Sequence, residues 1–284
     1  MSSGLPSFDL VVATVGRVDD LGRLLDSHER QTQRAFAVRV VDQNGDDRLR
    51  PVLTAHPELD LAHLRSERGL SRARNAALGS LDANAVAFPD DDCTYPVDLL
   101  ERVAHRLGED PGLDGLTGRA AAPDGSSSPS WKPDRAVLTR GNLWNRAISF
   151  TIFLRRELVE RVGAFDEQLG LGSGTPWHSG EEIDYLVRAV DAGARIEYDP
   201  SLVVTHPVRA DDDELGFRDG ASIGYLLRKH RYPSRVLARM LVRPVGGVAV
   251  SLARRDHDRA GYHAATLRGR IAGYRGARRS NSSR

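Results

Sequence analysis

Residues 85–92 read Ala85-Val86-Ala87-Phe88-Pro89-Asp90-Asp91-Asp92, an apolar run that ends in three adjacent carboxylates. Short apolar runs rich in β-branched residues are typical of buried strands. Two further runs of this kind lie upstream, at residues 9–15 and 37–41, and stretches with helical spacing of apolar residues separate the runs. This alternation predicts βαβ units, and therefore an α/β fold with a single, mainly parallel sheet flanked by helices.

The second half of the chain is less regular, and its elements are predicted one by one. Apolar runs predict strands, and helical spacing predicts helices. The expected strands cover residues 113–117, 149–154 and 202–205, the expected helices cover 157–162 and 181–192, and the chain after Phe217 is expected to be helical.

Polar residues stand where the early strands are expected to end. In open α/β sheets, ligands bind beyond the carboxyl ends of the strands. The residues to inspect there are Thr14 and Arg17, the segment 42–44, and the triplet 90–92.

The triplet has two readings. Adjacent like charges repel, so folding gives no reason for Asp90, Asp91 and Asp92 to stand together. Mg²⁺ and Mn²⁺ prefer oxygen ligands, commonly carboxylates, and such an ion would neutralise a departing diphosphate. The alternative is an acidic turn on the surface. His206, after the expected strand 202–205, is either a third metal ligand as a neutral imidazole or a structural residue.

Two other segments suit a nucleotide. Asp42, in Val41-Asp42-Gln43-Asn44-Gly45, would accept a hydrogen bond from a nucleobase N–H, although these residue types also form turns, and the turn reading is favoured for Asp42 alone. Residues 69–75 begin a helix with two arginines, including Arg74. Helix N-termini and arginine both suit phosphate, and the alternative is a solvated basic helix face.

A candidate catalytic base lies in Trp177-His178-Ser179-Gly180-Glu181-Glu182-Ile183-Asp184. Ser179 and Glu182 have the spacing of a capping box, which would explain both without any catalytic role. Alternatively, a carboxylate at this helix start accepts the proton of an attacking hydroxyl. Glu182 and Asp184 point about 200° apart around a helix, so they cannot share one pocket.

Composition predicts the compartment. A single cysteine, Cys93, excludes a disulfide framework and a Cys-based zinc cluster, and its expected lack of an activating partner makes it inert. The sequence shows no secretory signal, and the longest late apolar run, residues 244–253, is about half of what a membrane span needs. We therefore expect a cytoplasmic protein.

Charge is distributed unevenly along the chain. The net charge is +1, yet residues 225–284 hold fifteen Lys or Arg against two Asp and carry about +13, which leaves about −12 for residues 1–224. The arginines alternate with aliphatic residues, a pattern that fits peripheral contact with the inner face of a membrane better than nucleic acid, which we do not expect as a partner. A solvated face of packed helices explains the pattern equally well.

The order of these motifs resembles that of bacterial family 2 glycosyltransferases with the GT-A fold, over about residues 7–210. The resemblance rests on the first strand with Thr14 and Arg17, then Asp42, residues 69–75, the triplet 90–92, Phe165-Asp166-Glu167, residues 180–184 and His206. The triplet, and the combination of Phe165-Asp166-Glu167 with the later acids and histidine, are its most specific parts.

The resemblance implies a metal-dependent, inverting transfer of a sugar from a nucleotide-sugar donor, with a UDP- or dTDP-sugar favoured, to an acceptor hydroxyl. Thr14, Arg17, Asp42, Arg74, Asp90 and Asp91 would contact the donor, and Asp92, with Asp90 and His206, would bind Mg²⁺ or Mn²⁺. Glu182 stands where the family usually has Asp as catalytic base, with Glu181 and Asp184 as alternatives. Trp177 would stack on an acceptor sugar, or is a structural residue.

The expected organisation is a glycosyltransferase domain at 1–215, a helical basic extension at 216–274 and a disordered tail at 275–284. The expected process is the synthesis of a glycan, a cell-surface polysaccharide or a glycoconjugate. Two alternatives stay open. A nucleotidyltransferase would need a Gly-rich basic loop after the first strand, where Thr14-Val15-Gly16-Arg17 is poor in Gly. A catalytically silent module that docks on a membrane or a protein would have no need of the acidic residues.

Overall fold

The computed structural model describes residues 5–128, 130–207 and 212–280, which divide into two compact units. The sheet unit holds residues 5–68, 72–165 and 185–207. The helical unit holds residues 69–71, 166–184 and 212–280. Segment 166–184, which sequence reasoning assigned to the first domain, groups instead with the C-terminal helices. The division in space therefore does not follow a single cut in the sequence.

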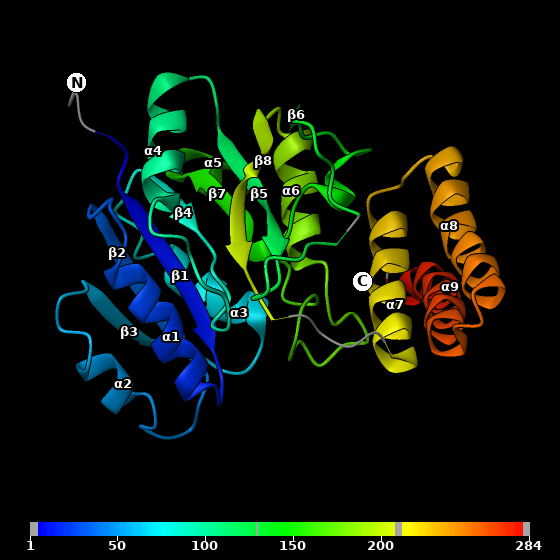
Figure 1. Ribbon diagram of the computed structural model, residues 1–284, viewed down its shortest axis with the longest axis horizontal. Coiled ribbons are helices and arrows are strands. Elements are labelled where there is room, and N and C mark those ends of the chain that lie inside the picture. The colour runs from blue at the N-terminus through cyan, green and yellow to red at the C-terminus, as the bar shows by residue number, and fades with distance from the viewer. Residues whose placement is uncertain (1–4, 129, 208–211, 281–284) are drawn as a thin grey trace. The chain divides into compact units, whose positions relative to one another are not determined.

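The sheet unit contains one sheet of eight strands in the order β3-β2-β1-β4-β7-β5-β8-β6 (Figure 1). Its strands are β1 (Phe8–Thr14), β2 (Phe36–Asp42), β3 (Leu61–Arg65), β4 (Ala85–Ala87), β5 (Gly115–Ala121), β6 (Ala136–Val137), β7 (Ile152–Arg155) and β8 (Ile196–Thr205). Strands β3, β2, β1 and β4 are parallel to one another, as are β5 and β8, whereas β7 and β6 pair antiparallel with their neighbours. The mainly parallel sheet expected from the sequence is confirmed, and β3 and β6 were missed.

The register of the sheet positions the candidate residues. Thr14 at the end of β1 stands opposite Asp42 at the end of β2. A bridge joins Ala13 to Asp90, and another joins Thr94 to Thr205. The carboxyl ends of β1, β2 and β4 and the end of β8 therefore meet at one edge, as parallel pairing requires.

Helices cover this sheet with apolar side chains. They are α1 (Val18–Glu29), α2 (Arg50–Thr54), α3 (Leu70–Leu78), α4 (Leu99–Glu109), α5 (Arg156–Val162) and α6 (Glu181–Asp191), with 3-10 turns at Leu143–Asn145 and Ser149–Thr151. Leu21, Leu24 and Leu25 of α1, which lie in the stretch of helical spacing between the first two apolar runs, are fully buried against the core that includes Phe8 and Leu10 of β1. The amphipathic pattern of α1 therefore places this helix against one face of the sheet.

The helical unit contains α7 (Asp213–Lys229), α8 (Ser234–Ala253) and α9 (His257–Ser280), drawn yellow to red in Figure 1. α7 and α9 pack at backbone distance: a Cβ on Gly224 would lie 2.1 Å from the carbonyl oxygen of Arg270, and one on Gly273 would lie 1.9 Å from that of Ala221. Only glycine fits these positions. The disordered tail expected from Arg275 differs from the structure, because α9 continues to Ser280; residues 281–284 lie outside the described residues.

α8 also departs from the expectation. The sequence offered an apolar run of residues 244–253, but the helix has 20 residues and a mean hydropathy of 1.5 over its most apolar window. By length and composition α8 is able to cross a membrane, and it is the one such helix among the described residues.

Candidate functional site

Three predicted metal ligands meet at the carboxyl edge of the sheet. Asp90 and Asp92 follow β4, and His206 follows β8. One ligand atom from each lies within 4.8 Å of the other two, and all three residues are partly buried. The bridge between Thr94 and Thr205 holds the two chain segments together although more than a hundred residues separate them in sequence. The grouping of Asp90, Asp92 and His206 is what a metal site at this edge requires.

Asp92 lies between the imidazole of His206 and the guanidinium of Arg17. Its carboxylate is 2.9 Å from Nε2 of His206 and also accepts a hydrogen bond from the guanidinium of Arg17. Burial raises the pKa of Asp92, but the hydrogen bonds and charges of His206 and Arg17 outweigh burial and lower this pKa to about 2. Asp92 is therefore ionised at neutral pH, which is the form that binds a metal.

Asp91 has a different environment. It is 7% exposed, and burial raises its pKa to about 6, against the opposing effects of the Thr14 hydroxyl and the Arg17 guanidinium. Its Oδ1 accepts a hydrogen bond of 2.9 Å from Arg17. Arg17 thus bridges Asp91 and Asp92, so the two residues predicted at the donor, Thr14 and Arg17, adjoin the acidic triplet.

Asp90 is held from two sides. Nη2 of Arg74 lies 3.2 Å from its Oδ1, and the hydroxyl of Ser149 donates to its oxygens at 3.2 and 3.3 Å. Arg74 is 1% exposed, and its guanidinium lies 5.8 Å from the ring centre of Phe88 and 5.5 Å from that of Phe165. The solvated basic face considered for Arg74 is wrong. The structure gives Arg74 a buried contact with Asp90, and its predicted contact with the nucleotide stays a prediction.

His206 is oriented by its surroundings. Its ring stacks on Phe150, with centroids 4.6 Å apart and planes 6° apart, and Nδ1 lies 2.7 Å from the carbonyl oxygen of Pro207. Burial lowers the pKa of His206, and the hydrogen bond and charge of Asp92 more than compensate, so that this pKa is raised. When Nδ1 donates to the Pro207 carbonyl, Nε2 faces Asp92 and is the nitrogen that a metal would use.

Asp42 forms the turn after β2. It is fully buried, and its Oδ1 accepts hydrogen bonds from the backbone and side-chain nitrogens of Asn44 at 2.8 and 2.7 Å. Its Oδ2 lies 2.9 Å from Nε2 of His63 and 3.1 Å from Nη1 of Arg65, both on β3. The turn reading of Asp42 is confirmed, and His63 and Arg65 are exposed polar groups beside it. The predicted contact of Asp42 with a nucleobase stays a prediction.

The acids expected to supply the base belong to the helical unit. Gly180, with φ of +88°, precedes α6, and its carbonyl accepts the first helical hydrogen bond, from the amide of Asp184. The predicted capping box is wrong, because Ser179 lies one residue before the cap and its hydroxyl donates to Asp219 at 3.0 Å. Asp184 is fully buried, 2.5 Å from Nζ of Lys229 and 2.8 Å from Nε2 of His230, so it pairs with the C-terminal end of α7 inside the helical unit.

The two glutamates and Trp177 differ in exposure. Glu181 is 4% exposed and lies against Gly170, whereas Glu182 is half-buried. Trp177 is also half-buried, and one face of its indole stacks on Tyr225 with ring centres 4.6 Å apart. Glu182 is therefore the most accessible of the three candidate bases.

A second group of possible metal ligands, Asp26, Glu29 and His56, lies elsewhere on the sheet unit. Asp26 is exposed and pairs with His56 at 3.1 Å. Exposed acidic groups of this kind are common without any ion.

Sequence reasoning missed Ser149, Phe150, His63 and Arg65. Ser149 and Phe150 stood inside a predicted strand, 149–154, but the structure has a 3-10 turn at Ser149–Thr151 that turns them toward Asp90 and His206. His63 and Arg65 lie on β3, which was not predicted. Cys93 is fully buried, and burial raises the pKa of its thiol well above the ordinary value, in agreement with the inert residue expected.

Comparison with known proteins identifies the arrangement. The chain is 24% identical over 219 residues to the glycosyltransferase AglE of Haloferax volcanii, a match that covers 74% of this chain and 69% of AglE. Its fold is similar to that of the Pyrobaculum calidifontis mannosyltransferase PcManGT, solved with GDP-Man and Mn²⁺, with a TM-score of 0.67, 18% identity, and coverage of 95% of this chain and 87% of that one.

A structure of Staphylococcus aureus TarS with UDP-GlcNAc is similar as well, with a TM-score of 0.63, 18% identity, and coverage of 95% of this chain and 92% of that one. The open sheet and these neighbours confirm the predicted GT-A fold. The family model for "Glycosyl transferase family 2" matches residues 9–165, which includes β1, the acidic triplet and the Ser149 turn. The chain therefore belongs to glycosyl transferase family 2.

Proposed function

We propose that this chain transfers a sugar from a nucleotide-sugar donor to an acceptor hydroxyl, with inversion at the anomeric carbon and with a divalent cation bound by Asp90, Asp92 and His206. The observation that carries the proposal is the convergence of these three side chains at the carboxyl edge of a family 2 sheet. The synthesis of a glycan or glycoconjugate is the process that such a transfer serves.

The residues present fit Mg²⁺ or Mn²⁺. Two carboxylates provide the hard oxygen donors that these ions prefer, and the imidazole of His206 adds a borderline nitrogen donor. The pKa of Asp92, about 2, keeps that carboxylate ionised. The Nδ1 contact of His206 with Pro207 and the Ser149 contact with Asp90 orient the ligands from outside. A divalent ion bound there would supply positive charge for the diphosphate that leaves the sugar.

The chain's own residues bind and orient the donor in this proposal. Thr14 and Arg17 adjoin the triplet, so they would contact the nucleoside and phosphate side of the donor, with Asp91 at the ribose. Asp42 holds the loop at the end of β2 through Asn44, and its carboxylate is proposed to face the nucleobase. Arg74 would act through Asp90, whose carboxylate it holds at 3.2 Å.

Glu182 is the proposed catalytic base. By the resemblance it falls where the family usually has its catalytic Asp. It is half-buried, whereas Glu181 and Asp184 are buried and Asp184 is paired with Lys229 and His230. Its carboxylate would accept the proton of the acceptor hydroxyl as the acceptor oxygen attacks the anomeric carbon opposite the departing diphosphate. One displacement of this kind inverts the configuration. Trp177 is half-buried and keeps its proposed role of stacking on an acceptor sugar.

The donor is proposed to be a UDP- or dTDP-sugar, and the protein is proposed to work in the cytoplasm. The two solved neighbours carry GDP-Man and UDP-GlcNAc, so the shared fold accepts more than one nucleotide. A donor panel must therefore include GDP-sugars.

The decisive experiment measures nucleotide release from UDP-, dTDP- and GDP-sugars with Mn²⁺, Mg²⁺ or EDTA. We expect one donor class to be turned over only with metal, and Asp92→Asn to abolish that turnover. Asp26→Asn, in the second acidic group, is the matched control and should retain wild-type turnover. If wild type neither binds nor turns over any donor with any metal, the proposal that the chain is an enzyme fails. The hypothesis of a catalytically silent module is then preferred.

The base is tested once a turned-over donor and acceptor are in hand. Glu182→Gln should lower transfer by roughly 10²- to 10⁴-fold with little change in donor binding, because general base catalysis contributes about that much. Glu181→Gln, the adjacent control, should retain most activity. A large loss of transfer in Glu181→Gln with a small loss in Glu182→Gln would identify Glu181, and not Glu182, as the base.

A further inference from the structure

Helix α8 exposes a continuous apolar stripe. Val242 is 66% exposed, Val245 51% and Leu252 51%, and Ala249 on the same face is exposed as well. The spacing of these residues, three, four and three along the helix, places them on one side. Large apolar side chains exposed over three turns are unusual on a protein surface that faces only water.

The opposite side of α8 is packed within the helical unit. Met240, Pro244 and Ser251 are buried, and the guanidinium of Arg270 on α9 donates a hydrogen bond to the carbonyl of Met240. The stripe therefore lies away from the buried side of α8, and Val245, Ala249 and Leu252 of the stripe also line an open groove beside α9. α8 therefore already packs on α9 through its buried side.

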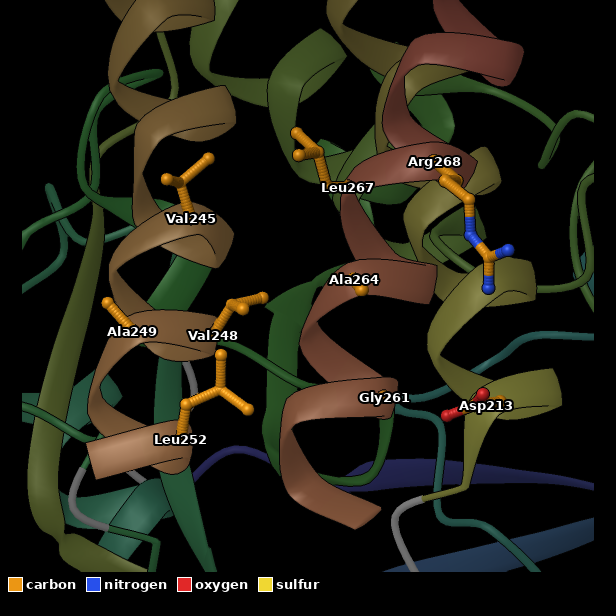
Figure 2. A pocket seen from close by; sticks show the side chains of 9 residues that line it. All are labelled: Asp213, Val245, Val248, Ala249, Leu252, Gly261, Ala264, Leu267 and Arg268. Atoms are coloured by element: carbon orange, nitrogen blue, oxygen red, sulfur yellow. The ribbon is translucent and has the colours of Figure 1, made fainter. Parts of the chain in front are cut away.

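A groove of about 650 Å³ continues the stripe toward α9 (Figure 2). Val248 and Leu252 of α8 point toward α9 in this view, where Ala264 and Leu267 line the other side. Two charged residues stand at the groove, Arg268 of α9 and Asp213 of α7. The exposed apolar surface is thus wider than a single helix face.

Positive charge flanks the stripe. Arg235, Arg239 and Arg243 recur every four residues, so they form a row along α8, and all three are exposed. The sequence from 231 to 255 contains six arginines and no aspartate or glutamate. An apolar stripe beside a row of cations is complementary to a surface whose interior is apolar and whose boundary is negatively charged.

We propose that α8, with the α8–α9 groove, docks in the plane of an anionic phospholipid bilayer. The valines and leucine of the stripe enter the boundary between headgroups and acyl chains, and the arginine row contacts lipid phosphates. This docking is independent of sugar transfer and would bring the enzyme to a membrane surface.

The packing of α8 favours docking in the plane over crossing the membrane. If α8 crossed the bilayer, Arg239 and Arg243 would lie inside the helix span, where each arginine costs about 2.5–3.5 kcal/mol near the centre. The side of α8 that holds Met240 and Pro244 is covered by the helical unit, so lipid reaches one side only. In the plane, the same arginines reach phosphate at no such cost.

Sedimentation with vesicles tests the proposal on the full chain. We expect wild type to bind vesicles of equal parts phosphatidylcholine and phosphatidylglycerol, to bind pure phosphatidylcholine far less, and to dissociate at high salt. Arg235→Gln with Arg239→Gln should weaken binding roughly 30-fold, because each arginine near an anionic surface changes the partition about fivefold. Val242→Ser with Val245→Ser should weaken it roughly tenfold.

Two double variants serve as matched controls. Val97→Ser with Val137→Ser removes exposed valines from the sheet unit, and Arg30→Gln with Arg50→Gln removes exposed arginines there, so both should bind vesicles as wild type does. Donor turnover and circular dichroism should be unchanged in all four variants. The proposal is overturned if wild type does not bind anionic vesicles, or if the control variants lose as much binding as the test variants. It is also overturned if the stripe forms a dimer in the absence of lipid and the double variant Val242→Ser with Val245→Ser dissociates that dimer.

Discussion

Among single residues, Ser149 supports the proposed metal ligand Asp90 from outside the cluster. Its hydroxyl donates to the carboxylate of Asp90, and it is 6% exposed. Ser149→Ala removes this support without removing a ligand, so the affinity for Mn²⁺ should fall by about tenfold. Mn²⁺ titration followed by electron paramagnetic resonance of the free ion measures the change. Ser126→Ala, in an exposed loop, is the control, and equal affinities in the two variants would refute the support role.

His28 provides a prediction about stability. It is fully buried between Phe36 and Tyr95, neither ring nitrogen has a hydrogen-bond partner among the described residues, and burial lowers its pKa to about 3. The unfolded chain binds a proton near pH 6.5, the folded chain only near pH 3. This difference stabilises the fold fully above pH 6.5 and is lost as the pH falls toward 3, at up to about 1.4 kcal/mol per pH unit.

In His28→Phe this component is absent, so wild type should lose stability relative to the variant as the pH falls from 6.5 to 4. Urea unfolding at a series of pH values measures the difference. The exposed His105→Gln should follow wild type at every pH. Parallel curves for wild type and His28→Phe would contradict the prediction, whatever their offset at neutral pH.

Site residues could be predicted where their residue type is unusual for the position. The acidic triplet and a histidine after a strand are such cases, and the structure brings Asp90, Asp92 and His206 together. Arg74 and Ser149 could not be assigned to Asp90 in advance, because the contact depends on the burial of one side chain and on a 3-10 turn in place of a strand. Neither feature can be predicted from a single sequence.

At the level of elements, the glycines of α7 and α9 decide how two helices meet. Gly216, Gly220 and Gly224 recur every four residues on α7, and a Cβ at Gly224 would lie 2.1 Å from a carbonyl oxygen of α9. Gly224→Ala should therefore destabilise the helical unit by about 1–3 kcal/mol, the usual cost of overpacking. Helix propensity alone predicts the opposite sign, because Ala is favoured over Gly by about 1 kcal/mol.

Gly246→Ala on α8 is the matched control. A Cβ there meets nothing within 4 Å, so this variant should gain stability from helix propensity. Thermal unfolding followed by tryptophan fluorescence compares the two variants in a Trp131→Phe, Trp144→Phe background, where Trp177, stacked on Tyr225 of α7, is the remaining tryptophan. Stabilisation by both would show that α7 and α9 do not pack at backbone distance.

Elements were predictable where periodicity was long or the run was strongly apolar, as in β1, β2, α1 and α6. β3 was missed because Leu61–Arg65 alternates weakly and carries a histidine and an arginine. β6 has two residues and exists through its pairing with β8. The three C-terminal helices were predicted only as a helical region, since their glycine spacing has meaning only when the partner helix is known.

On the scale of the whole molecule, the sequence predicted a domain followed by an extension, and the structure has two units interwoven along the chain. The fold class could be predicted because strand-like and helix-like spacings of apolar residues alternate along the chain. These spacings are local features of the sequence. The assignment of residues 166–184 to the helical unit depends on contacts such as Lys229 with Asp166 at 2.6 Å, between residues far apart in sequence. Local patterns hold no information on that pairing.

The two units also lead to a prediction about metal and stability. All three proposed ligands, Asp90, Asp92 and His206, belong to the sheet unit. Mn²⁺ at about 100 times its dissociation constant should therefore stabilise that unit by about 2.7 kcal/mol, because an ion that binds only the folded state shifts unfolding by mass action. The helical unit should gain less.

Tryptophan fluorescence separates the two responses. Trp131 and Trp144 lie in the sheet unit and Trp177 in the helical unit, so Trp177→Phe reports the first and the double variant Trp131→Phe with Trp144→Phe reports the second. Thermal unfolding with and without Mn²⁺ should show the larger shift in Trp177→Phe. Adding Asp92→Asn should remove that shift, whereas Asp26→Asn should keep it. A shift that persists in Asp92→Asn and disappears in Asp26→Asn would place the ion at the exposed second group and leave the sheet edge without its proposed metal.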